Sequence, residues 1–567
     1  MPRQPRASAL HCNAMAELTI NGKKYPFTPG QTILQAALDQ GIEVPHYCYH
    51  PSLSVVANCR ICLGEVWQPN SKTGKLEPFP KLVPTCQQAA APGMVVYTDS
   101  PKAVANQKSV MELLLINHPV DCPVCDQAGE CHLQDYSYQY GRSESRFQEA
   151  KNKQPKKDVG PNILLYSDRC IMCTRCVRFT REVTGTNELM VDGRGSTEQI
   201  DIFPGMALDN ELAGNVVDLC PVGALLDKDF LFQQRVWFLK KTASIDGITA
   251  SGDNISVEHN EGRVYRIKPR VNEAVNQWWI TDEVRYGWKF VHADARITMP
   301  SIRGKEAFDV LKPVEAWRTA LAAVDSAMTT LRTVTKKNLA LLVSPMLSCE
   351  DAFHLARYAL SVDADALLAV GPIPFNGEDK TFPGGFTIRA EKAPNARGVR
   401  RVLEALANGK PVANAQGFES ALASGSYGGA IVTGNYASAW VTPSIAAALK
   451  NVATIVSIDT LPNTVTAMAT IVLPGATWLE KAGSFENAKS RLQSFEQAID
   501  TVEYARSESQ IALDLAAARA GKITTNYCAN ATRTEMAKVA TLDCMAHALH
   551  APEQTETVES DMAMSQL

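Results

Sequence analysis

The distribution of cysteine constrains this chain more than any other feature of its sequence. Eleven of the fifteen cysteines lie between Cys48 and Cys220, and the others are Cys12, Cys349, Cys528 and Cys544. Disulfide frameworks belong to small secreted domains, whereas a long chain with one cysteine-dense segment and no secretory signal is typical of intracellular metal binding. At 567 residues, roughly three or four domains are expected. The sequence therefore predicts a metal-binding first part joined to a second part of another kind.

Charge and hydropathy exclude several classes of function. A formal net charge of -4 over 567 residues is close to neutral, so neither nucleic-acid binding nor a basic membrane-binding face is predicted. No run of eighteen apolar residues occurs, so no membrane-spanning segment is expected. The first fourteen residues are basic and contain no acid, which suggests a targeting peptide, and Met15 is an equally good start.

The first group of cysteines follows a predicted hairpin and helix. LTINGKKYPF places two strand-like runs around Asn21-Gly22, and QTILQAALDQG has helical periodicity ending at Gly41. This order is typical of a ferredoxin-like β-grasp domain. Four cysteines follow in a pattern similar to the plant-type [2Fe-2S] motif, although ten residues separate the first two where that motif has four. They are Cys48, Cys59, Cys62 and Cys86, for which a zinc site or buried free thiols are the alternatives.

The most specific group is C-x2-C-x2-C at residues 170–176, with a distant Cys220 before proline. In two-cluster ferredoxins the last cysteine of each such run binds the cluster of the other run. Thr180 stands where the fourth cysteine of the first run would be, and a second run ending at Cys220 lacks its other three cysteines. One [4Fe-4S] cluster is therefore predicted, bound by Cys170, Cys173, Cys176 and Cys220.

Between these groups, HPVDCPVCDQAGEC at residues 118–131 follows a predicted helix with Ser100 as N-cap and Pro119 beyond its end. One histidine and three cysteines also form a common structural zinc set. Redox-inert zinc would interrupt an electron path between two iron-sulfur sites, whereas a [4Fe-4S] cluster would continue it. We therefore favour a [4Fe-4S] cluster bound by His118, Cys122, Cys125 and Cys131.

Together the three ligand sets resemble the large iron-sulfur subunit, or 75-kDa subunit, of respiratory NADH-quinone oxidoreductase, complex I. The resemblance rests on H-x3-C-x2-C-x5-C and the two flanking sets, and is dense from residue 15 to about residue 290. It implies one [2Fe-2S] and two [4Fe-4S] clusters, with the histidine as a ligand of the middle one. Some bacterial members hold a further [4Fe-4S] cluster, but no cysteine occurs between Cys220 and Cys349, so none is expected.

The remaining sequence predicts a different architecture. Residues 242–269 alternate like a small antiparallel sheet, and strand-then-helix patterns from residue 338 predict a parallel α/β sheet. GSFENAKSRLQSF resembles a stretch of molybdopterin oxidoreductases. No G-x-G-x-x-G follows a strand, and Cys349 reads as a small buried hydrophobe, so no molybdopterin is expected.

The predicted fold class is thus an α+β N-terminal part followed by an α/β molybdopterin-oxidoreductase-like domain. The expected domains are 15–99, a [2Fe-2S] β-grasp domain; 100–150, a helical [4Fe-4S] domain with one histidine and three cysteine ligands; 151–235, a ferredoxin-like [4Fe-4S] domain; 236–530, the α/β domain; and 531–567, a C-terminal tail.

The predicted function is electron transfer from a flavin-bearing partner towards quinone, as an oxidoreductase subunit without its own NADH, flavin or quinone site. The resemblance implies four kinds of partner: the flavin/NADH subunit, a small [2Fe-2S] subunit, a ferredoxin-like subunit with two [4Fe-4S] clusters, and the quinone-site subunits. It also implies a peripheral location on the cytoplasmic side of a bacterial inner membrane or on the matrix side of the mitochondrial one. The alternatives are the electron-input subunit of an NAD-linked hydrogenase or formate dehydrogenase, and a structural zinc scaffold.

Overall fold

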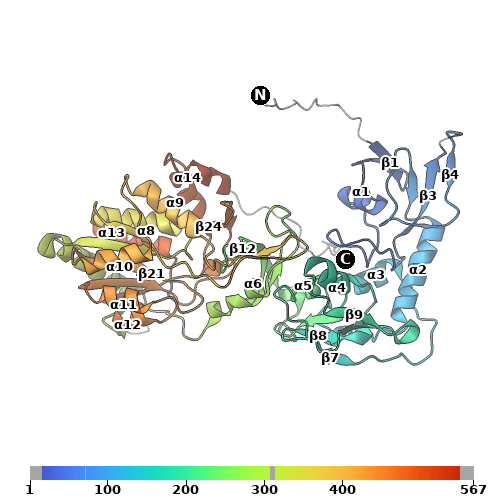
Figure 1. Ribbon diagram of the computed structural model, residues 1–567, viewed down its shortest axis with the longest axis horizontal. Helices are drawn as coiled ribbons and strands as arrows, with labels where there is room; N and C mark the ends of the chain where they lie inside the picture. Colours follow the sequence, from blue (N-terminus) through green and yellow to red (C-terminus); the bar gives the residue numbers. More distant parts are fainter. Residues whose placement is uncertain (1–15, 71, 307–312, 550–567) are drawn as a thin grey trace. The chain divides into compact units, whose positions relative to one another are not determined.

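The computed structural model describes residues 16–70, 72–306 and 313–549, which form two compact units (Figure 1). Unit 1 lies within residues 1–210 and 216–237, and unit 2 within residues 211–215 and 238–567. The predicted targeting peptide and the alternative start lie outside the described residues. In the part of the chain that the structure describes, no helix is long and apolar enough to cross a membrane.

Unit 1 begins with a mixed sheet packed against one helix. The first two strands pair antiparallel around Asn21 and Gly22, whose φ angles are 49° and 81°. The strand order is β2-β1-β6-β3-β4, with β5 paired to β3. Leu18 and Ile20 of the sheet pack against Ile33 of the helix. The elements are β1 (Ala16–Ile20), β2 (Lys23–Phe27), α1 (Ile33–Asp39), β3 (Leu63–Pro69), β4 (Leu76–Pro78), β5 (Val83–Pro84) and β6 (Val95–Tyr97).

The rest of unit 1 consists of short elements joined by long loops. The Ser100 hydroxyl accepts a hydrogen bond from the backbone N–H of Ala103 and so caps α2, which ends at Leu115, earlier than the predicted stop at Pro119. A three-stranded sheet has the order β11-β8-β7, and β9 pairs with β10. The elements are α2 (Pro101–Leu115), α3 (His132–Tyr140), β7 (Lys156–Asp158), β8 (Ile163–Tyr166), α4 (Arg175–Arg178), β9 (Leu189–Asp192), β10 (Gln199–Ile202), α5 (Asn215–Leu219) and β11 (Leu225–Asp227).

Unit 2 begins with the expected antiparallel sheet, β12 (Lys240–Ile245), β13 (Asn254–Asn260) and β14 (Arg263–Pro269). A seven-stranded sheet follows in the order β16-β15-β23-β22-β21-β17-β18, and its last five strands are parallel. Its strands are β15 (Ser301–Ile302), β16 (Lys305–Glu306), β17 (Asn338–Val343), β18 (Leu367–Val370), β21 (Tyr427–Thr433), β22 (Thr454–Asp459) and β23 (Ile471–Pro474).

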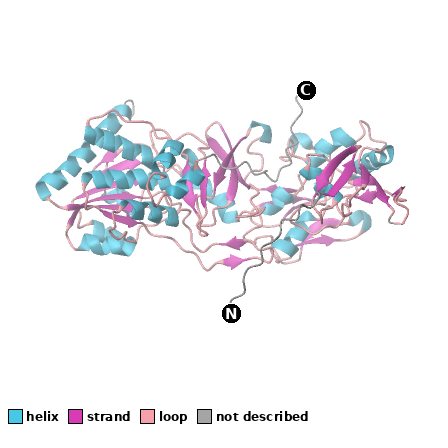
Figure 2. Cartoon of the chain, turned by 90° about the horizontal axis from the view of Figure 1, so that it is seen from above, coloured by secondary structure: helices cyan, strands magenta, loops and turns pink. Residues whose placement is uncertain are grey.

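Helices cover both faces of this sheet (Figure 2) because its central strands are apolar on both sides. Leu339, Leu341 and Val343 of β17 face one hydrophobic core, and Ala340 and Leu342 face another. The helices of unit 2 are α6 (Asp282–Tyr286), α7 (Pro313–Thr330), α8 (Cys349–Val362), α9 (Ala396–Leu406), α10 (Ala415–Ala423), α11 (Pro443–Leu449), α12 (Thr464–Met468), α13 (Glu508–Ala520) and α14 (Ala529–Met536).

The structure differs from the predicted tail of residues 531–567. The helix α14 and a short turn at Asp543–Ala548 place Met536, Leu542 and Met545 in the first of these cores. These apolar side chains are separated by polar residues, so the segment looked hydrophilic although one side of it is buried. Residues 550–567 lie outside the described part of the chain.

Candidate metal centres

The first predicted ligand set is brought together by a loop and two strands of unit 1. Cys48 and Cys59 lie on the loop between α1 and β3, Cys62 immediately precedes β3, and Cys86 follows β5. The thiols of Cys59 and Cys86 donate hydrogen bonds to the sulfur of Cys48, which lowers the pKa of Cys48. Cys86 also donates to Cys62 and lowers its pKa to about 7. Hydrogen bonds therefore link all four sulfurs, and as thiolates they would supply one ligand each to a centre of more than one metal ion.

The third predicted set surrounds a cavity, although Cys220 is distant in sequence from the other three. Burial raises the pKa of all four thiols, that of Cys173 to about 11. An apolar cavity opposes thiolate formation, and bound metal cations remove that penalty. The cavity is lined by Cys170, Cys173, Cys176 and Cys220 and by apolar residues that include Leu165, Ile171, Ile200, Val222, Ala224 and Leu225.

Four thiols that line a cavity are arranged differently from the ligands of a single metal ion, which converge on one point. Within the described residues, no three His, Cys, Asp or Glu side chains form a group that could hold a single metal ion. The ligands of a [4Fe-4S] cluster bind different iron atoms, so they line a space the size of the cluster instead of meeting at one point. The four thiols around the cavity fit such a cluster in number and in chemistry.

The middle set is positioned by the ends of two helices. His118 follows α2, Cys122 begins a short 3-10 turn, and Cys131 is the N-cap residue of α3. Burial raises the pKa of Cys125 and of Cys131, with the charge of Cys122 acting on Cys125 and that of Cys125 acting on Cys131. The three thiols therefore lie within electrostatic range of one another.

His118 has the state that a metal ligand requires. Its Nδ1 atom is buried and has no hydrogen-bond partner among the described residues. Burial lowers the pKa of His118, which keeps the imidazole neutral, and neutral imidazole is the form that binds metals. Its role as the fourth ligand of the middle set stays a prediction.

Residues other than glycine adopt positive φ angles beside the ligands at all three sites. This conformation costs a residue with a side chain on the order of 1 kcal/mol or more and is typical of functional loops. At the third site it turns the backbone N–H of Met172 towards Cys170 Sγ, at 3.3 Å. The residues are Ala57 and Arg60 around Cys59, Val120 before Cys122, and Met172 and Thr174 around Cys173, with φ between 47° and 60°.

The middle and third sets pack closely at Gly223, which sequence reasoning missed. A Cβ atom on Gly223 would lie 2.3 Å from Cys125 Sγ, so no larger residue fits there. The backbone N–H of His132 donates to the carbonyl of Pro221 at 3.0 Å in the same region. The available sequence signal was the position of this glycine, three residues after Cys220.

Sequence reasoning also missed three buried arginines, Arg169, Arg175 and Arg178. Their signal was the interleaving of arginine with cysteine in RCIMCTRCVRF. Arg169 forms an ion pair with Asp121 at 2.5 Å and donates to the Gly223 carbonyl at 3.4 Å, linking the third set to the loop of the middle set.

Comparisons with known families define the class of protein. The chain contains, in order, a 2Fe-2S iron-sulfur cluster binding domain at residues 13–101, an NADH-ubiquinone oxidoreductase-G iron-sulfur binding region at 107–146 and a ferredoxin-like domain of NADH-quinone oxidoreductase subunit 3 at 160–226. An NDSU1/NuoG-like 4Fe-4S domain matches residues 239–289, and molybdopterin oxidoreductase matches 418–518. Over these segments the chain is similar to iron-sulfur proteins of the oxidoreductase class, and the predicted order of its domain types is confirmed.

Two curated relatives are similar to part of this chain. The chain is 44% identical over 320 residues to the mitochondrial NADH-ubiquinone oxidoreductase 78 kDa subunit of Neurospora crassa. The matched region covers 56% of this chain and 41% of that protein. It is 38% identical over 342 residues to an NADH-quinone oxidoreductase subunit of Rickettsia felis, which covers 60% of this chain and 48% of that protein. The matched part of the chain is thus similar to subunits of NADH-ubiquinone and NADH-quinone oxidoreductases, and the chain spans less than half the length of these relatives.

One solved structure, an NAD+-reducing [NiFe]-hydrogenase in the H2-reduced state, is 28% identical and matches with a TM-score of 0.32 over 39% of this chain and 91% of that one.

The segment of unit 2 that matches a 4Fe-4S domain lacks the cysteine donors that this name implies. Residues 239–289 contain no cysteine. Asp246 in this segment instead accepts hydrogen bonds from the backbone N–H groups of Ile248 and Thr249. A cysteine-bound cluster does not fit these residues.

Proposed function

We propose that this chain is an electron-transfer subunit of NADH-quinone oxidoreductase that holds one [2Fe-2S] and two [4Fe-4S] clusters in unit 1. The observation that carries the proposal is the cavity around Cys170, Cys173, Cys176 and Cys220, because it joins a local run to a distant cysteine as a cross-over ligand requires. Such clusters, when bound, supply one-electron transfer.

The residues of unit 1 perform three tasks in this function. The thiolates would hold the clusters at fixed positions, on loops whose backbone has positive φ beside ligands of each set. Apolar side chains such as Leu165 and Ile200 exclude water from the third site. Contacts such as that between Gly223 and Cys125 keep neighbouring sites close, as stepwise electron transfer needs.

The wider assignment follows from the relatives. Electrons would enter from a flavin-bearing subunit and leave towards subunits that carry further [4Fe-4S] clusters and the quinone site. The chain would attach to the membrane through these partners, on the cytoplasmic or the matrix side. In this proposal unit 2 binds no molybdopterin, although it contains the matched molybdopterin oxidoreductase segment.

Metal analysis of the anaerobically purified chain tests the proposal. We expect about ten iron atoms per chain, two from the [2Fe-2S] cluster and four from each [4Fe-4S] cluster, with neither zinc nor molybdenum. Electron paramagnetic resonance of the reduced protein should show three distinct signals. Stoichiometric zinc with about six irons would contradict the assignment of the middle set, and zinc alone would leave only the scaffold alternative.

A further inference from the structure

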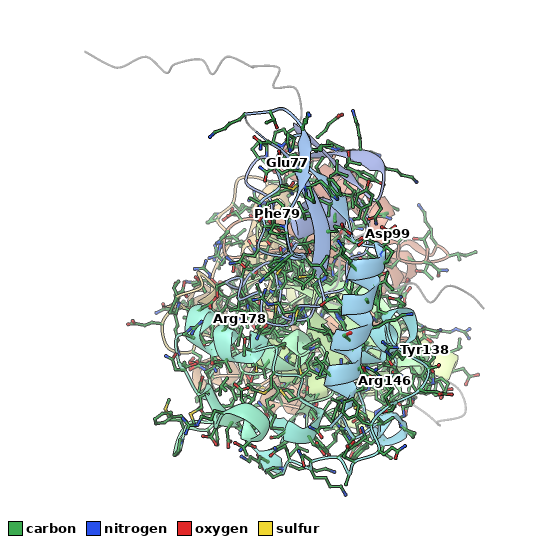
Figure 3. The ribbon with its side chains drawn as sticks, turned by 90° about the vertical axis from the view of Figure 1, so that its right-hand side faces the viewer. Glu77, Phe79, Asp99, Tyr138, Arg146 and Arg178 are labelled. Atoms are coloured by element: carbon green, nitrogen blue, oxygen red, sulfur yellow. The ribbon has the colours of Figure 1, made fainter. Side chains whose placement is uncertain are left out.

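The buried Arg178 joins the backbone of the first ligand set to that of the third. Its side chain is 2% exposed and lies where the blue loops of the first domain meet the teal helices (Figure 3). One guanidinium nitrogen, Nη2, donates to the carbonyl of Cys48 at 2.5 Å and to that of Cys173 at 3.3 Å. The other, Nη1, donates to the carbonyl of Ser54 at 2.5 Å. A single side chain therefore binds the peptide groups of one ligand from each set.

Arg175, one helical turn earlier, makes the same connection beside it. Its Nη2 atom donates to the carbonyl of Tyr49 at 2.6 Å, and its Nη1 atom donates to that of Leu219 at 3.4 Å. Tyr49 follows the first-set ligand Cys48, and Leu219 precedes the third-set ligand Cys220. Two planar guanidinium groups thus fix the same pair of loops, a geometry that the single ammonium group of lysine does not reproduce.

The charge on Arg178 has no carboxylate partner within hydrogen-bonding distance among the described residues, and its Nε atom is buried without a hydrogen-bond partner. Arg175 shares both properties. A buried unpaired cation is costly unless an anion lies nearby. The groups that interact electrostatically with Arg178 are Cys173 and Cys48, one from each set, together with the cation of Arg175 and the carboxylate of Glu182. The single carboxylate of Glu182 is opposed by the cation of Arg175, and thiolates that hold iron-sulfur clusters would add negative charge beside both arginines.

We propose that Arg178 is a positioning residue that fixes the spacing of the first and third metal sites and raises the reduction potential of both. The inference rests on the proposed function. A nearby positive charge in a buried site favours the incoming electron, and charge together with hydrogen bonding around the cluster sulfurs sets the potential. Because Arg178 binds both loops, its effect reaches two sites and leaves the middle one, which contains His118, unaffected.

Redox titration of the full chain carrying Arg178→Gln, followed by electron paramagnetic resonance, tests this inference. At a fixed potential we expect roughly a tenfold shift towards the oxidised form at the first and third sites, equal to about 59 mV for a one-electron couple. The middle site should keep its midpoint and serves as an internal reference. The matched control is Arg181→Gln, which removes the same charge from an arginine that is 58% exposed and paired with Glu182. It should shift neither potential.

A second variant separates charge from geometry. Arg178→Lys keeps the positive charge but cannot bind all three carbonyls, so both clusters should form with midpoints closer to wild type than those of Arg178→Gln. If Arg178→Gln loses the first and third clusters but keeps the middle one, the positioning role stands and the lysine variant decides the role of charge.

Two sets of results would overturn the inference. Unchanged midpoints in Arg178→Gln with all three clusters present would refute it while leaving the proposed function intact. Loss of all three clusters in both variants would show a general folding role instead. A wild-type chain without iron-sulfur signals would refute the proposed function itself, so the two failures are distinguishable.

Discussion

Units 1 and 2 differ in how some of their buried cations are neutralised. In unit 2, the buried Lys481 pairs with Asp351 at 2.8 Å and with Glu508, and the buried Arg533 pairs with Glu350 at 3.0 Å. In unit 1, the buried Arg169 also pairs with a carboxylate, that of Asp121. The equally buried Arg175 and Arg178 instead bind only backbone carbonyls. Buried cations need a negative partner. We therefore expect anionic groups bound to unit 1, such as clusters with thiolate ligands, to add negative charge beside Arg175 and Arg178.

Buried cysteine separates the units in the same way. Cys349 of unit 2 packs in an aliphatic core with Leu347 and Ala352 and contacts Asn395 at 3.6 Å. The ligand cysteines of unit 1 instead lie beside backbone strained into positive φ, as at Ala57 and Met172. Strained backbone of this kind persists where the surrounding structure or a bound group stabilises it. We therefore expect the stability of unit 1, and not that of unit 2, to depend on metal.

Removal of iron should produce the largest effect. Because metal-binding free energy becomes folding free energy, a chelator under reducing conditions should make unit 1 sensitive to protease while unit 2 stays resistant. Limited proteolysis with mass spectrometry of the fragments measures both units in one sample. Equal sensitivity of the two units would show that the comparison drawn from their buried charges is wrong.

Loss of one cross-over ligand should remove one cluster. Cys220→Ala deletes a donor from the cavity of the third site, so one [4Fe-4S] signal should disappear while the [2Fe-2S] signal of the Cys48 set remains. Iron content should fall by about four atoms per chain. Cys349→Ala is the matched control, since it removes a buried cysteine of unit 2 and should cost no iron. Retention of all clusters in Cys220→Ala would refute the cross-over assignment.

The contrast also explains how far sequence reasoning reached. The ligand runs could be predicted because cluster chemistry requires cysteine at fixed spacings. Strands such as β17 could be predicted because both of their faces are apolar. The roles of Arg178 and Gly223 could not be predicted from the sequence. Arg178 acts through carbonyls of residues 130 and 124 positions away, and Gly223 is constrained by a sulfur from another loop. Such contacts depend on tertiary packing, which no local pattern records.

Breaking the charge pairs of unit 2 should destabilise it whether or not iron is bound. Lys481→Met leaves the carboxylates of Asp351 and Glu508 buried together without a cation, and we expect a loss of about 3–5 kcal/mol in the free energy of unfolding. Urea denaturation measures the change. The control is Lys410→Met, which breaks an exposed pair with Asp365 and should cost less than about 1 kcal/mol. Similar losses in both variants would contradict the importance of burial.

The pH dependence of unit 2 should reveal Glu508. Burial raises the pKa of Glu508 from 4.5 to about 7. Because the pKa of Glu508 is higher in the folded protein than in the unfolded one, protonated Glu508 stabilises the folded state. This stabilisation is complete below the unfolded pKa of 4.5 and is lost as pH rises through about 7. Asp351, whose pKa is lowered from 3.8, loses its contribution only at lower pH and so is constant across that window. Glu508→Gln mimics the protonated form, so it should remove roughly 2–3 kcal/mol of the decrease in stability between about pH 4.5 and 7. Parallel pH profiles for wild type and variant would refute this role.

The smallest expected effect concerns His118, where a neutral donor stands among thiolates. Imidazole carries no charge when it binds a metal, whereas thiolate carries a full negative charge, so His118→Cys adds one negative charge beside the middle cluster. Added negative charge disfavours the incoming electron, as the higher potentials of histidine-ligated Rieske centres also indicate. We therefore expect His118→Cys to keep its iron with a lowered midpoint at one site.

His118→Ala should weaken or lose that cluster because no donor replaces the imidazole. Redox titration of both variants measures this, with the first and third sites as internal references. Unchanged potentials in both would leave the buried Nδ1 atom without a metal role and place the fourth ligand of the middle set elsewhere in unit 1.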